Sequence, residues 1–332
     1  MKYWLITGGC GFIGTRLVQK LVEHKGYAVR IIDNLTVGTP DDLGRVCAFE
    51  QVDSFTENGF AAPTVNRVQL IVADILNPDL ALQAGEGMDV VVHLAANTGV
   101  GPSVEDPRAD MLANVVGTFN YLESARMNKI PRFIFASSGA PAGEVDPPIH
   151  EELPPHPVSP YGASKLAGEG YCSAYKRTFG IDTVMLRFGN VYGPGSGHKN
   201  SVVAKFIRQA LRGETLEMFG DGTQTRDFIF SDDLIRALMN AVLLPDIGGE
   251  AFQIATNRET TVREMAELLL AVLEEAGVAR VPLINASQRL GDVKRNYSDT
   301  TKARQRLGWI AETNLQQGLK RTVDYFLNNR DA

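Results

Sequence analysis

Residues 3–14 read YWLITGGCGFIG, and residues 15–24 continue as a helix-like stretch. A short apolar run, a glycine-rich turn and a helix in this order favour phosphate binding, because glycine lets the backbone approach a phosphate group closely. The N-terminus of the helix adds unpaired N–H groups and the positive end of the helix dipole. The glycines fit G-x-G-x-x-G from Gly9 to Gly14 and G-x-x-G-x-x-G from Gly8 to Gly14. The stretch therefore predicts the first strand and helix of a dinucleotide-binding α/β fold.

Six short apolar runs alternate with longer helix-like segments, which is the rhythm of a parallel α/β sheet. The runs are residues 3–7, 29–32, 69–72, 90–94, 133–136 and 183–188. Each run is continuously apolar, so both faces of the sheet should be covered by helices. This arrangement is typical of a doubly wound fold, whose ligand site lies at the carboxyl ends of the strands.

The pattern changes after Asn190 to loops, short strands and amphipathic helices. One helix is expected at residues 261–275, where Thr261 and Glu264 form a capping box. The predicted fold class is α/β, a doubly wound parallel Rossmann-type sheet with a smaller α/β C-terminal substrate-binding region. The predicted domains are a Rossmann domain at 1–189, with a return segment at about 226–256, and a second region at 190–225 and 257–332.

The chain has the composition of an ordinary globular protein, with 332 residues and 44% hydrophobic content. A net charge of −6 gives no footprint for nucleic acid, so local arginines and lysines must hold any anionic ligand. The cysteines Cys10, Cys47 and Cys172 are widely spaced, which suits a reducing compartment and shows no zinc spacing. The first strand leaves no room for a leader, and no apolar run reaches the length of a membrane span. We expect a cytoplasmic protein without a metal, a membrane contact or a nucleic-acid partner.

The second apolar run ends at Asp33, nineteen residues after Gly14. A carboxylate at this place accepts hydrogen bonds from the adenosine ribose hydroxyls and repels a 2′-phosphate. The next residues are Asn34 and Leu35 rather than arginine, which favours NAD over NADP. Arg30 lies within the strand and is the residue that could reverse this preference.

The ends of the third and fourth strands contribute to the same site. Asp74 is placed to meet the adenine amino group, while Leu94, Ala95 and Ala96 keep small atoms beside the cofactor. His93 comes before the strand end, so we interpret it as a core histidine rather than a catalyst.

A further motif, Tyr161-Gly162-Ala163-Ser164-Lys165, begins twenty-three residues after Ser138. Tyrosine is a poor base at its ordinary pKa of about 10, so a proton-transferring tyrosine needs a cation beside it. Residues four apart share one helix face, which places Lys165 beside Tyr161. Lowering the phenol pKa to about 7 requires roughly 4 kcal/mol, and Lys165 with an oxidised nicotinamide would supply it in a partly dry cleft. We predict Ser138, Tyr161 and Lys165 as the catalytic residues.

Together these motifs resemble the extended short-chain dehydrogenase/reductase superfamily, within it the nucleotide-sugar epimerases and dehydratases typified by UDP-glucose 4-epimerase. The resemblance also rests on Asn114-Val115-Val116-Gly117-Thr118, on RFGNVYGPG at 187–195, on GDGTQTRDF at 220–228 and on RLGDV at 289–293. It covers nearly the whole chain, and it implies an NAD-dependent enzyme that acts on a UDP-sugar and forms a homodimer.

The resemblance also implies site residues. The predicted cofactor-binding residues are Gly8, Gly11, Phe12, Ile13, Gly14, Asp33, Asn34, Asp74, Ile75, Leu94, Ala95, Ala96, Asn114, Tyr161 and Lys165. The family uses residues matching Asn190, Arg226 and Arg289 for the diphosphate, and a planar arginine fork suits phosphate oxygens. It uses positions matching Val202, Val203, Leu216 and Phe219 for the nucleobase. The predicted substrate-binding residues are Ser138, Asn190, Val202, Leu216, Phe219, Arg226, Arg289 and Asp292.

Two departures from the family pattern bear on the reaction. Dehydratases and decarboxylases of the family carry an acid shortly after the catalytic serine or threonine, whereas this chain has Gly139 and Ala140. Ala142 stands where tyrosine is usual, which widens the pocket and leaves the sugar open. We therefore predict epimerisation at C4 of a UDP-sugar through a 4-keto intermediate. The alternatives are a UDP-glucuronate decarboxylase or a dehydratase with an acid from elsewhere, a reductase, and a non-catalytic NAD-binding regulator.

Overall fold

The computed structural model describes residues 2–52, 59–198, 201–287 and 293–329. The chain forms two compact units. Unit 1 comprises residues 1–143, 151–187 and 237–252, and unit 2 comprises residues 144–150, 188–236 and 253–332. The predicted assignment of cofactor and substrate binding to separate domains stays a prediction.

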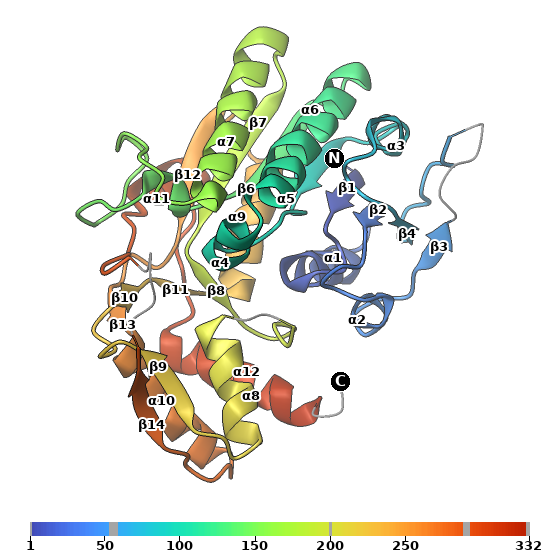
Figure 1. The fold of residues 1–332 in the computed structure, drawn as a ribbon. Helices are drawn as coiled ribbons and strands as arrows, with labels where there is room; N and C mark the ends of the chain where they lie inside the picture. The colour runs from blue at the N-terminus through green and yellow to red at the C-terminus, as the bar shows by residue number, and fades with distance from the viewer. Residues whose placement is uncertain (1, 53–58, 199–200, 288–292, 330–332) are drawn as a thin grey trace. The chain divides into compact units, whose positions relative to one another are not determined.

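The centre of unit 1 is an eight-stranded sheet with the order β12-β7-β6-β5-β1-β2-β4-β3 (Figure 1). Its strands are β1 (Tyr3–Thr7), β2 (Ala28–Asp33), β3 (Glu50–Val52), β4 (Val68–Val72), β5 (Val90–His93), β6 (Arg132–Ser138), β7 (Asp182–Phe188) and β12 (Glu250–Ile254). The pairs from β3 through β6 are parallel, so the predicted parallel α/β sheet is confirmed. The six apolar runs are all strands. The sequence missed β3 and β12, because β3 reads EQV and is mostly exposed, without an apolar run.

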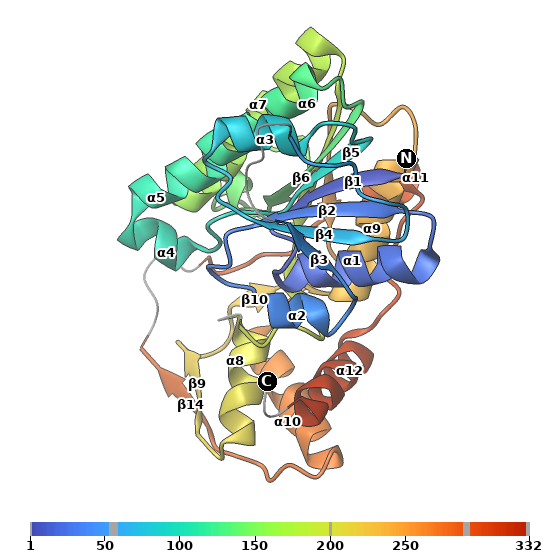
Figure 2. The ribbon, with the colours of Figure 1, turned by 90° about the vertical axis from the view of Figure 1, so that its right-hand side faces the viewer.

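Helices cover both faces of this sheet. Unit 1 contains α1 (Phe12–His24), α2 (Pro40–Gly44), α3 (Pro78–Ala84), α4 (Val100–Glu105), α5 (Pro107–Met111), the π-helix η1 (Leu112–Val116), α6 (Gly117–Met127), the 3₁₀ helix η2 (Ala140–Ala142) and α7 (Pro160–Phe179). Helices α3, α6 and α7 lie on one face and α1 lies on the other (Figure 2). The first face buries a cluster that includes Val91, Tyr121 and Phe133, and each such side chain contributes roughly 1.5–3 kcal/mol.

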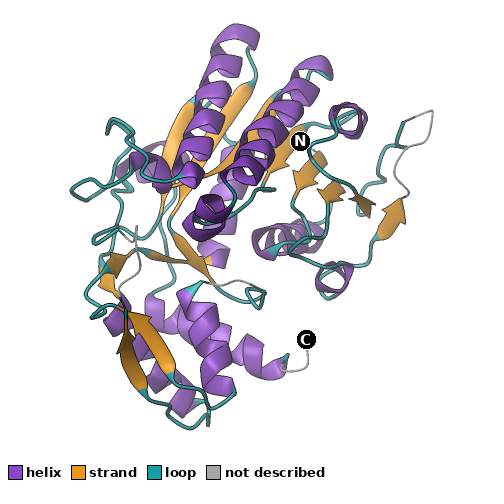
Figure 3. Cartoon of the chain, viewed as in Figure 1, coloured by secondary structure: helices purple, strands orange, loops and turns teal. Residues whose placement is uncertain are grey.

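Unit 2 is the smaller unit and combines helices with short strands (Figure 3). Its elements are β8 (Asn190–Tyr192), α8 (Val202–Leu211), β9 (Leu216–Phe219), β10 (Thr225–Arg226), β11 (Phe228–Phe230), β13 (Thr260–Thr261), α10 (Val262–Glu275), β14 (Leu283–Ala286), α11 (Thr301–Leu307) and α12 (Leu315–Asn328), while α9 (Ser231–Leu243) runs from unit 2 into unit 1. Apolar side chains from α8, α10 and α12 form its core with the parallel pair β9 and β14. The capping box of Thr261 and Glu264 is confirmed at the start of α10.

Two glycines of α7 have opposite surroundings. A Cβ on Gly168 would overlap the ring of Phe135 on β6, whereas a Cβ on Gly170 would meet no atom within 4 Å. The close approach of α7 to β6 therefore depends on Gly168 and not on Gly170.

We predict that Gly168→Ala lowers the free energy of unfolding by about 1–3 kcal/mol through overpacking. Gly170→Ala is the matched control and should raise it by about 0.5–1 kcal/mol, because alanine favours a helix interior. Urea denaturation of the two variants and the parent measures both effects. Equal stability of the two variants would contradict the close packing of α7 on β6.

Candidate active site

The glycine-rich turn lies directly against the end of β5. Gly8 has a φ of +71°, and a Cβ there would be 2.8 Å from the backbone nitrogen of Ala95. A Cβ on Gly14 would overlap the carbonyl oxygen of Gly8. Gly11 is the N-cap of α1 and supplies no side-chain acceptor for the first turn of the helix. The turn is thus a backbone cradle that any side chain would fill, with the positive end of a helix dipole exposed to it.

Asp33 is fixed to this turn. The carboxylate is buried, its Oδ2 accepts the N–H of Cys10 at 2.9 Å, and its Oδ1 accepts the N–H of Leu35 at 2.9 Å. Burial raises the pKa of Asp33, and the two backbone N–H groups act in the opposite direction. Each carboxylate oxygen retains a lone pair for a further donor. The predicted ribose acceptor is therefore held at a fixed position beside the glycine turn.

Arg30 does not accompany Asp33. Its side chain is fully buried within unit 1, where the guanidinium donates to the carbonyl oxygens of Ala84 and Ala61 at 2.8 and 2.7 Å. The guanidinium also lies 5.4 Å from the ring centroid of Phe60. Arg30 is consequently a structural cation, and the possibility that it binds a 2′-phosphate is removed.

The residues after β4 form the next part of the rim. Asn34 donates to the carboxylate of Asp74 at 3.0 Å, which joins the ends of β2 and β4. Ile75 is buried against Gly117, and its carbonyl oxygen accepts a hydrogen bond from Asn120 at 3.0 Å. The sequence missed Asn120, although it is the second residue after the Gly117-Thr118 pair of the asparagine motif.

His93 is a core residue, as predicted. It is 1% exposed, with Nδ1 2.9 Å from the Thr7 hydroxyl and Nε2 3.2 Å from the Thr118 hydroxyl. Thr118 gives its hydrogen to the carbonyl oxygen of Asn114 at 2.6 Å, so Nε2 carries the ring hydrogen and Nδ1 accepts from Thr7. Burial lowers the pKa of His93 to about 3 and keeps the ring neutral. Thr7 also accepts the N–H of Ala95, which ties β1 to the predicted Leu94–Ala96 segment.

The predicted catalytic residues come together at β6 and α7. Ser159 caps α7 and Pro160 occupies its first turn, so Tyr161 and Lys165 lie one turn apart, as the helical spacing predicted. Lys165 is buried, and its Nζ is 5.9 Å from the ring centroid of Tyr161. The ammonium donates to the carbonyl oxygen of Ala136 at 2.9 Å. Ser138 ends β6, where its hydroxyl accepts the N–H of Ala140 at 3.2 Å.

The electrostatics of this group differ from the prediction. Burial raises the pKa of Tyr161 to about 12, although a hydrogen bond with Ser138 lowers it in part. Burial likewise lowers the pKa of Lys165 to about 8. The expected lowering of the phenol pKa is therefore absent from the protein by itself, because desolvation outweighs the hydrogen bond with Ser138 and the charge of Asp110 adds to the rise. The second cation that the prediction required must come from a bound cofactor.

Asn114 joins several segments around Lys165. Its Oδ1 accepts the N–H of Asn97 at 2.8 Å, and its Nδ2 lies 3.0 Å from oxygen atoms of Asn97, Asp110 and Ser164. The sequence missed Asp110, yet a signal existed, because Asp110 precedes Asn114 by four residues and so shares its helix face. Asn114 itself is buried in the π-helix η1, and π-helical turns are frequent at functional sites.

A buried ion pair supports the catalytic helix. Arg187 on β7 donates to both carboxylate oxygens of Glu169 on α7, at 2.8 and 2.7 Å. Ser137, which precedes Ser138, donates to the same carboxylate at 2.6 Å. This bidentate pair fixes α7 to the ends of β6 and β7.

The residues predicted to bind a sugar nucleotide belong to unit 2. Asn190 begins β8 and is paired with Phe228, two residues after Arg226. Arg226 donates to the carbonyl oxygens of Thr225 and Val293 at 2.6 and 2.8 Å. The strands β8 and β11 thus place Asn190 near Arg226. Arg289 and Asp292 lie outside the described residues.

The predicted nucleobase residues have unequal exposure. Val202 begins α8 and is partly buried, whereas Leu216 and Val203 are completely enclosed in the core of unit 2. Phe219 is 40% exposed, and the Lys205 ammonium lies 5.2 Å from its ring centroid. Phe219 is therefore the most exposed member of this set.

The turn after Ser138 carries no carboxylate. Gly139, Ala140 and Pro141 fill the positions where family dehydratases have an acid, and a Cβ on Gly139 would meet no atom within 4 Å. Ala142 is buried in η2. Gly139 and Ala140 thus place no ionisable side chain next to Ser138, and the position of a Gly139 side chain is open.

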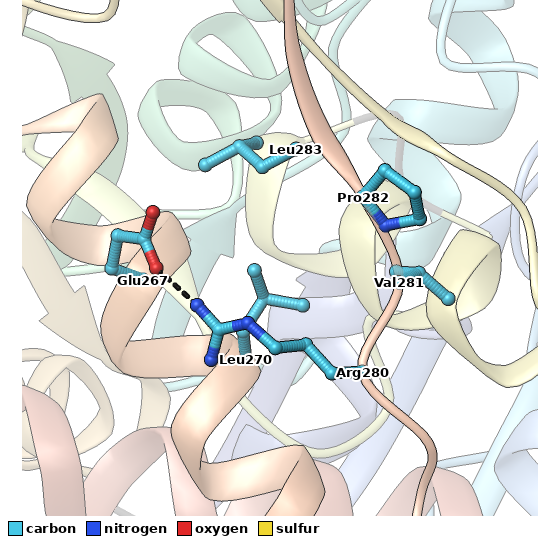
Figure 4. A pocket seen from close by; sticks show the side chains of 6 residues that line it. All are labelled: Glu267, Leu270, Arg280, Val281, Pro282 and Leu283. Carbon is cyan, nitrogen blue, oxygen red and sulfur yellow. Dashed lines mark hydrogen bonds and ion pairs between the residues drawn. The ribbon is translucent and has the colours of Figure 1, made fainter.

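A separate pocket of about 350 Å³ in unit 2 is lined by Glu267, Leu270, Arg280, Val281, Pro282 and Leu283 (Figure 4). Arg280 forms ion pairs with Glu267 at 2.5 Å and with Glu274 at 2.8 Å, so its charge is already neutralised. None of the predicted site residues lines this pocket.

Within residues 2–52, 59–198, 201–287 and 293–329, no cluster of His, Cys, Asp and Glu side chains could hold a metal ion. No helix in the same ranges is long and apolar enough to cross a membrane.

The residues of unit 1 fit a nicotinamide dinucleotide. The glycine cradle admits a pyrophosphate at the α1 N-terminus, whose first turn contains no acidic residue. Asp33 is held where a ribose hydroxyl would donate to it, and Lys165 uses one hydrogen for Ala136 and retains two more. The raised pKa of Tyr161 shows the need for a further positive charge, which an oxidised nicotinamide carries.

The sequence was compared with known proteins. It matches the NAD dependent epimerase/dehydratase family over residues 4–255. A putative UDP-glucose 4-epimerase of Methanocaldococcus jannaschii is 37% identical over 330 residues, and the UDP-glucose 4-epimerase of Mycolicibacterium smegmatis is 36% identical over 329 residues, with 98% of each chain covered in both cases. The crystal structure of the Thermotoga maritima UDP-glucose 4-epimerase with UDP-glucose superposes with a TM-score of 0.87, at 34% identity and 99% coverage of both chains. With its glycine cradle, its fixed Asp33 and its paired Tyr161 and Lys165, this chain belongs to the NAD-dependent epimerase/dehydratase family.

Proposed function

We propose that the protein is an NAD-dependent epimerase that inverts C4 of a UDP-sugar. The observation that carries this proposal is the buried Lys165 ammonium beside Tyr161. Ser138 is hydrogen-bonded to the Tyr161 phenol, and the same unit also holds the dinucleotide cradle. The relatives described above are named as UDP-glucose 4-epimerases, one of them putative. The similarity to them extends over nearly the full length of each chain, which supports the substrate class.

When bound, NAD would supply the redox chemistry of this proposal, by taking up a hydride from C4 of the sugar and returning it to the opposite face. Tyr161, as phenolate, accepts the proton of the sugar 4-hydroxyl and later gives it back to the same oxygen. The Ser138 hydroxyl donates to that oxygen while a 4-keto sugar exists. Lys165 holds the nicotinamide ribose and stabilises the phenolate by its charge. Electrons and protons balance over the cycle, so bound cofactor need not be exchanged.

The absence of a carboxylate at Gly139 and Ala140 favours epimerisation over elimination. Removal of water across C5 and C6 needs an acid and a base near C5. Gly139 and Ala140 have no ionisable side chain, so this turn supplies neither the acid nor the base for elimination.

We further propose that unit 2 holds the uridine diphosphate part of the substrate. Arg226 and Arg289 would bind the diphosphate together with Asn190, and Phe219 would contact the base beside Val202. Leu216 is enclosed in the core and would support this site from beneath. Asp292 stays a predicted member of this set. The sugar itself is not named by these contacts.

The protein is also proposed to form a homodimer and to work in the cytoplasm. Exposed apolar side chains line α6 and α7, among them Phe119, Tyr171 and Phe179. The Phe119 and Tyr171 rings touch at a centroid distance of 5.6 Å, so they form one surface on these two helices. The thiols Cys10, Cys47 and Cys172 are unpaired, which suits a reducing compartment.

The first test is a product panel. Fresh protein is incubated with UDP-glucose, UDP-glucuronate and UDP-N-acetylglucosamine, and the products are analysed by mass and sugar NMR. We expect an unchanged mass with inverted C4 for one of these sugars. Tyr161→Phe should keep its NAD content and lose at least about 100-fold in turnover, while Tyr171→Phe on the same helix should keep the parent rate. Loss of water or carbon dioxide from the product would replace epimerisation by the dehydratase or decarboxylase alternative.

The second test concerns the cofactor. Asp33→Ser should weaken NAD binding by about 10- to 100-fold, corresponding to roughly 1.5–3 kcal/mol for a hydrogen bond to a charged group. It should also reduce the preference for NAD over NADP, because the charge that repels a 2′-phosphate is gone. Asp41→Asn removes the same charge from the start of α2 and should leave both affinities unchanged. Calorimetry of apo protein with each dinucleotide measures them, and an unaltered NAD affinity for Asp33→Ser would remove the ribose role.

The third test is the oligomeric state. Sedimentation velocity should show a dimer for the parent protein and a single chain for Tyr171→Glu, because the new charge would be buried in the interface. Ile284→Glu places the same charge at an exposed apolar position on β14 and should remain dimeric. A parent protein that sediments as one chain would refute the homodimer.

A further inference from the structure

Asp110 is a buried carboxylate that the proposed chemistry has not used. It lies near the end of α5 and is 1% exposed. Its Oδ1 accepts a hydrogen bond from Nδ2 of Asn114 at 3.0 Å. Its Oδ2 is equally buried and has no hydrogen-bond partner among the described residues. Burial raises the pKa of Asp110, whereas a hydrogen bond with Ser164 and the charge of Lys165 lower it. Leaving a carboxylate oxygen buried without a donor is costly, so a nearby positive charge is needed to offset it.

That charge is Lys165. A chain of two residues, Asn114 and Ser164, connects Asp110 to it. The Asn114 amide that binds Asp110 is also 3.0 Å from the Ser164 hydroxyl. Ser164 directly precedes Lys165, and its hydroxyl donates to the carbonyl oxygen of Tyr161 at 3.0 Å. No direct Asp110–Lys165 ion pair occurs among the described salt bridges, so the carboxylate acts on the ammonium through space.

The other ionisable groups around this cluster are few. Those that face Lys165 are Asp110 on α5, Glu169 and Cys172 on α7, and His93 on β5. Glu169 is already paired with Arg187, burial raises the pKa of the Cys172 thiol far above neutrality, and His93 is neutral. Asp110 is therefore the carboxylate near Lys165 without an ion-pair partner of its own.

The remaining elements packed against α7 add no competing charge. The segments η1 and η2 read LANVV and APA and contain no ionisable residue. Glu105 on α4 and Arg108 on α5 are exposed, whereas Glu123 and Arg126 on α6 pair with each other at 2.8 Å. Arg132 on β6 donates to the carbonyl oxygens of Ala241 and Leu244 at the opposite end of the strand.

We propose that Asp110 is a positioning residue of the active site: its buried carboxylate keeps the Lys165 ammonium charged and balances the charge of the cluster during proton transfer by Tyr161. This rests on the proposed epimerase function. In the reacting state the cluster holds the Lys165 ammonium, the Tyr161 phenolate and an oxidised nicotinamide ring. Without Asp110 these three carry one net positive charge in a buried site, and with the carboxylate they sum to zero.

The charge of Asp110 acts in the same direction on both catalytic groups. It raises the pKa of Lys165 and it raises the pKa of Tyr161. Turnover requires Tyr161 deprotonated and Lys165 protonated, so activity rises with pH through the first pKa and falls through the second. Removing the carboxylate should lower both pKa values and move the whole profile toward acid.

The test compares Asp110→Asn with Glu105→Gln, which removes a charge from an exposed position on the neighbouring α4. The pH profile of kcat/KM and an ultraviolet titration of the Tyr161 phenolate in the NAD-loaded protein, taken as the difference from Tyr161→Phe, are measured for both. We expect Asp110→Asn to shift both limbs and the phenolate titration by about one pH unit toward acid. Glu105→Gln should match the parent protein.

Two results would overturn the proposal. One is a lower rate at every pH with both limbs and the phenolate titration unmoved, which is the outcome of a purely structural role. The other is a shift toward alkaline pH. If Asp110→Asn does not fold, Asp110→Ser, a smaller neutral polar residue, is measured in the same way. The phenolate titration needs no turnover, so it tests Asp110 even if the product panel removes the epimerase function.

Discussion

The buried ammonium of Lys165 is the constraint on which the arrangement of unit 1 depends. A charged group in a dry interior must be offset by acceptors and by opposite charge. Here the offset comes from the carbonyl oxygen of Ala136, the ring face of Phe135 at 5.0 Å, and the carboxylates of Asp110 and Glu169. These partners come from β6, α5 and α7 itself, so solvating one cation fixes three elements. The close contact of Gly168 with Phe135 is part of the same fit.

The same burial gives the site its dependence on a cofactor. Desolvation raises the pKa of Tyr161 and lowers that of Lys165. Without a cofactor, the protein therefore holds a neutral Tyr161 phenol beside a Lys165 ammonium whose pKa is lowered. An additional positive charge beside Tyr161 and Lys165 would lower the pKa of the Tyr161 phenol. Proton transfer is thus coupled to occupancy of the dinucleotide cradle. Asp33 serves the cradle in a comparable way, because the backbone N–H of Cys10 in the turn and that of Leu35 hold its carboxylate before any ribose arrives.

Much of this could be predicted from local pattern. The apolar runs predicted strands because continuous burial leaves a continuous signature, and the spacing of Tyr161 and Lys165 placed them on one helix face. Other features were not readable. Arg30 looked like a candidate phosphate ligand, but its direction depends on Ala61 and Ala84, which are distant in sequence. Leu216 matched a base-binding position and is fully enclosed in core. The raised pKa of Tyr161 in the protein without cofactor was not readable either, because desolvation depends on the whole surrounding fold.

The sequence by itself determined the fold class, the position of the glycine turn, the acid at the end of β2 and the catalytic helix. These properties follow from short-range spacing, because glycine conformation, strand burial and helix periodicity act within a few residues. Only the tertiary structure decided the charge state of the site and the residues that set it. Asp110 and Lys165 are 55 positions apart in the numbering and are joined through Asn114 and Ser164. Such long-range electrostatics depend on burial and distance, which no local pattern contains.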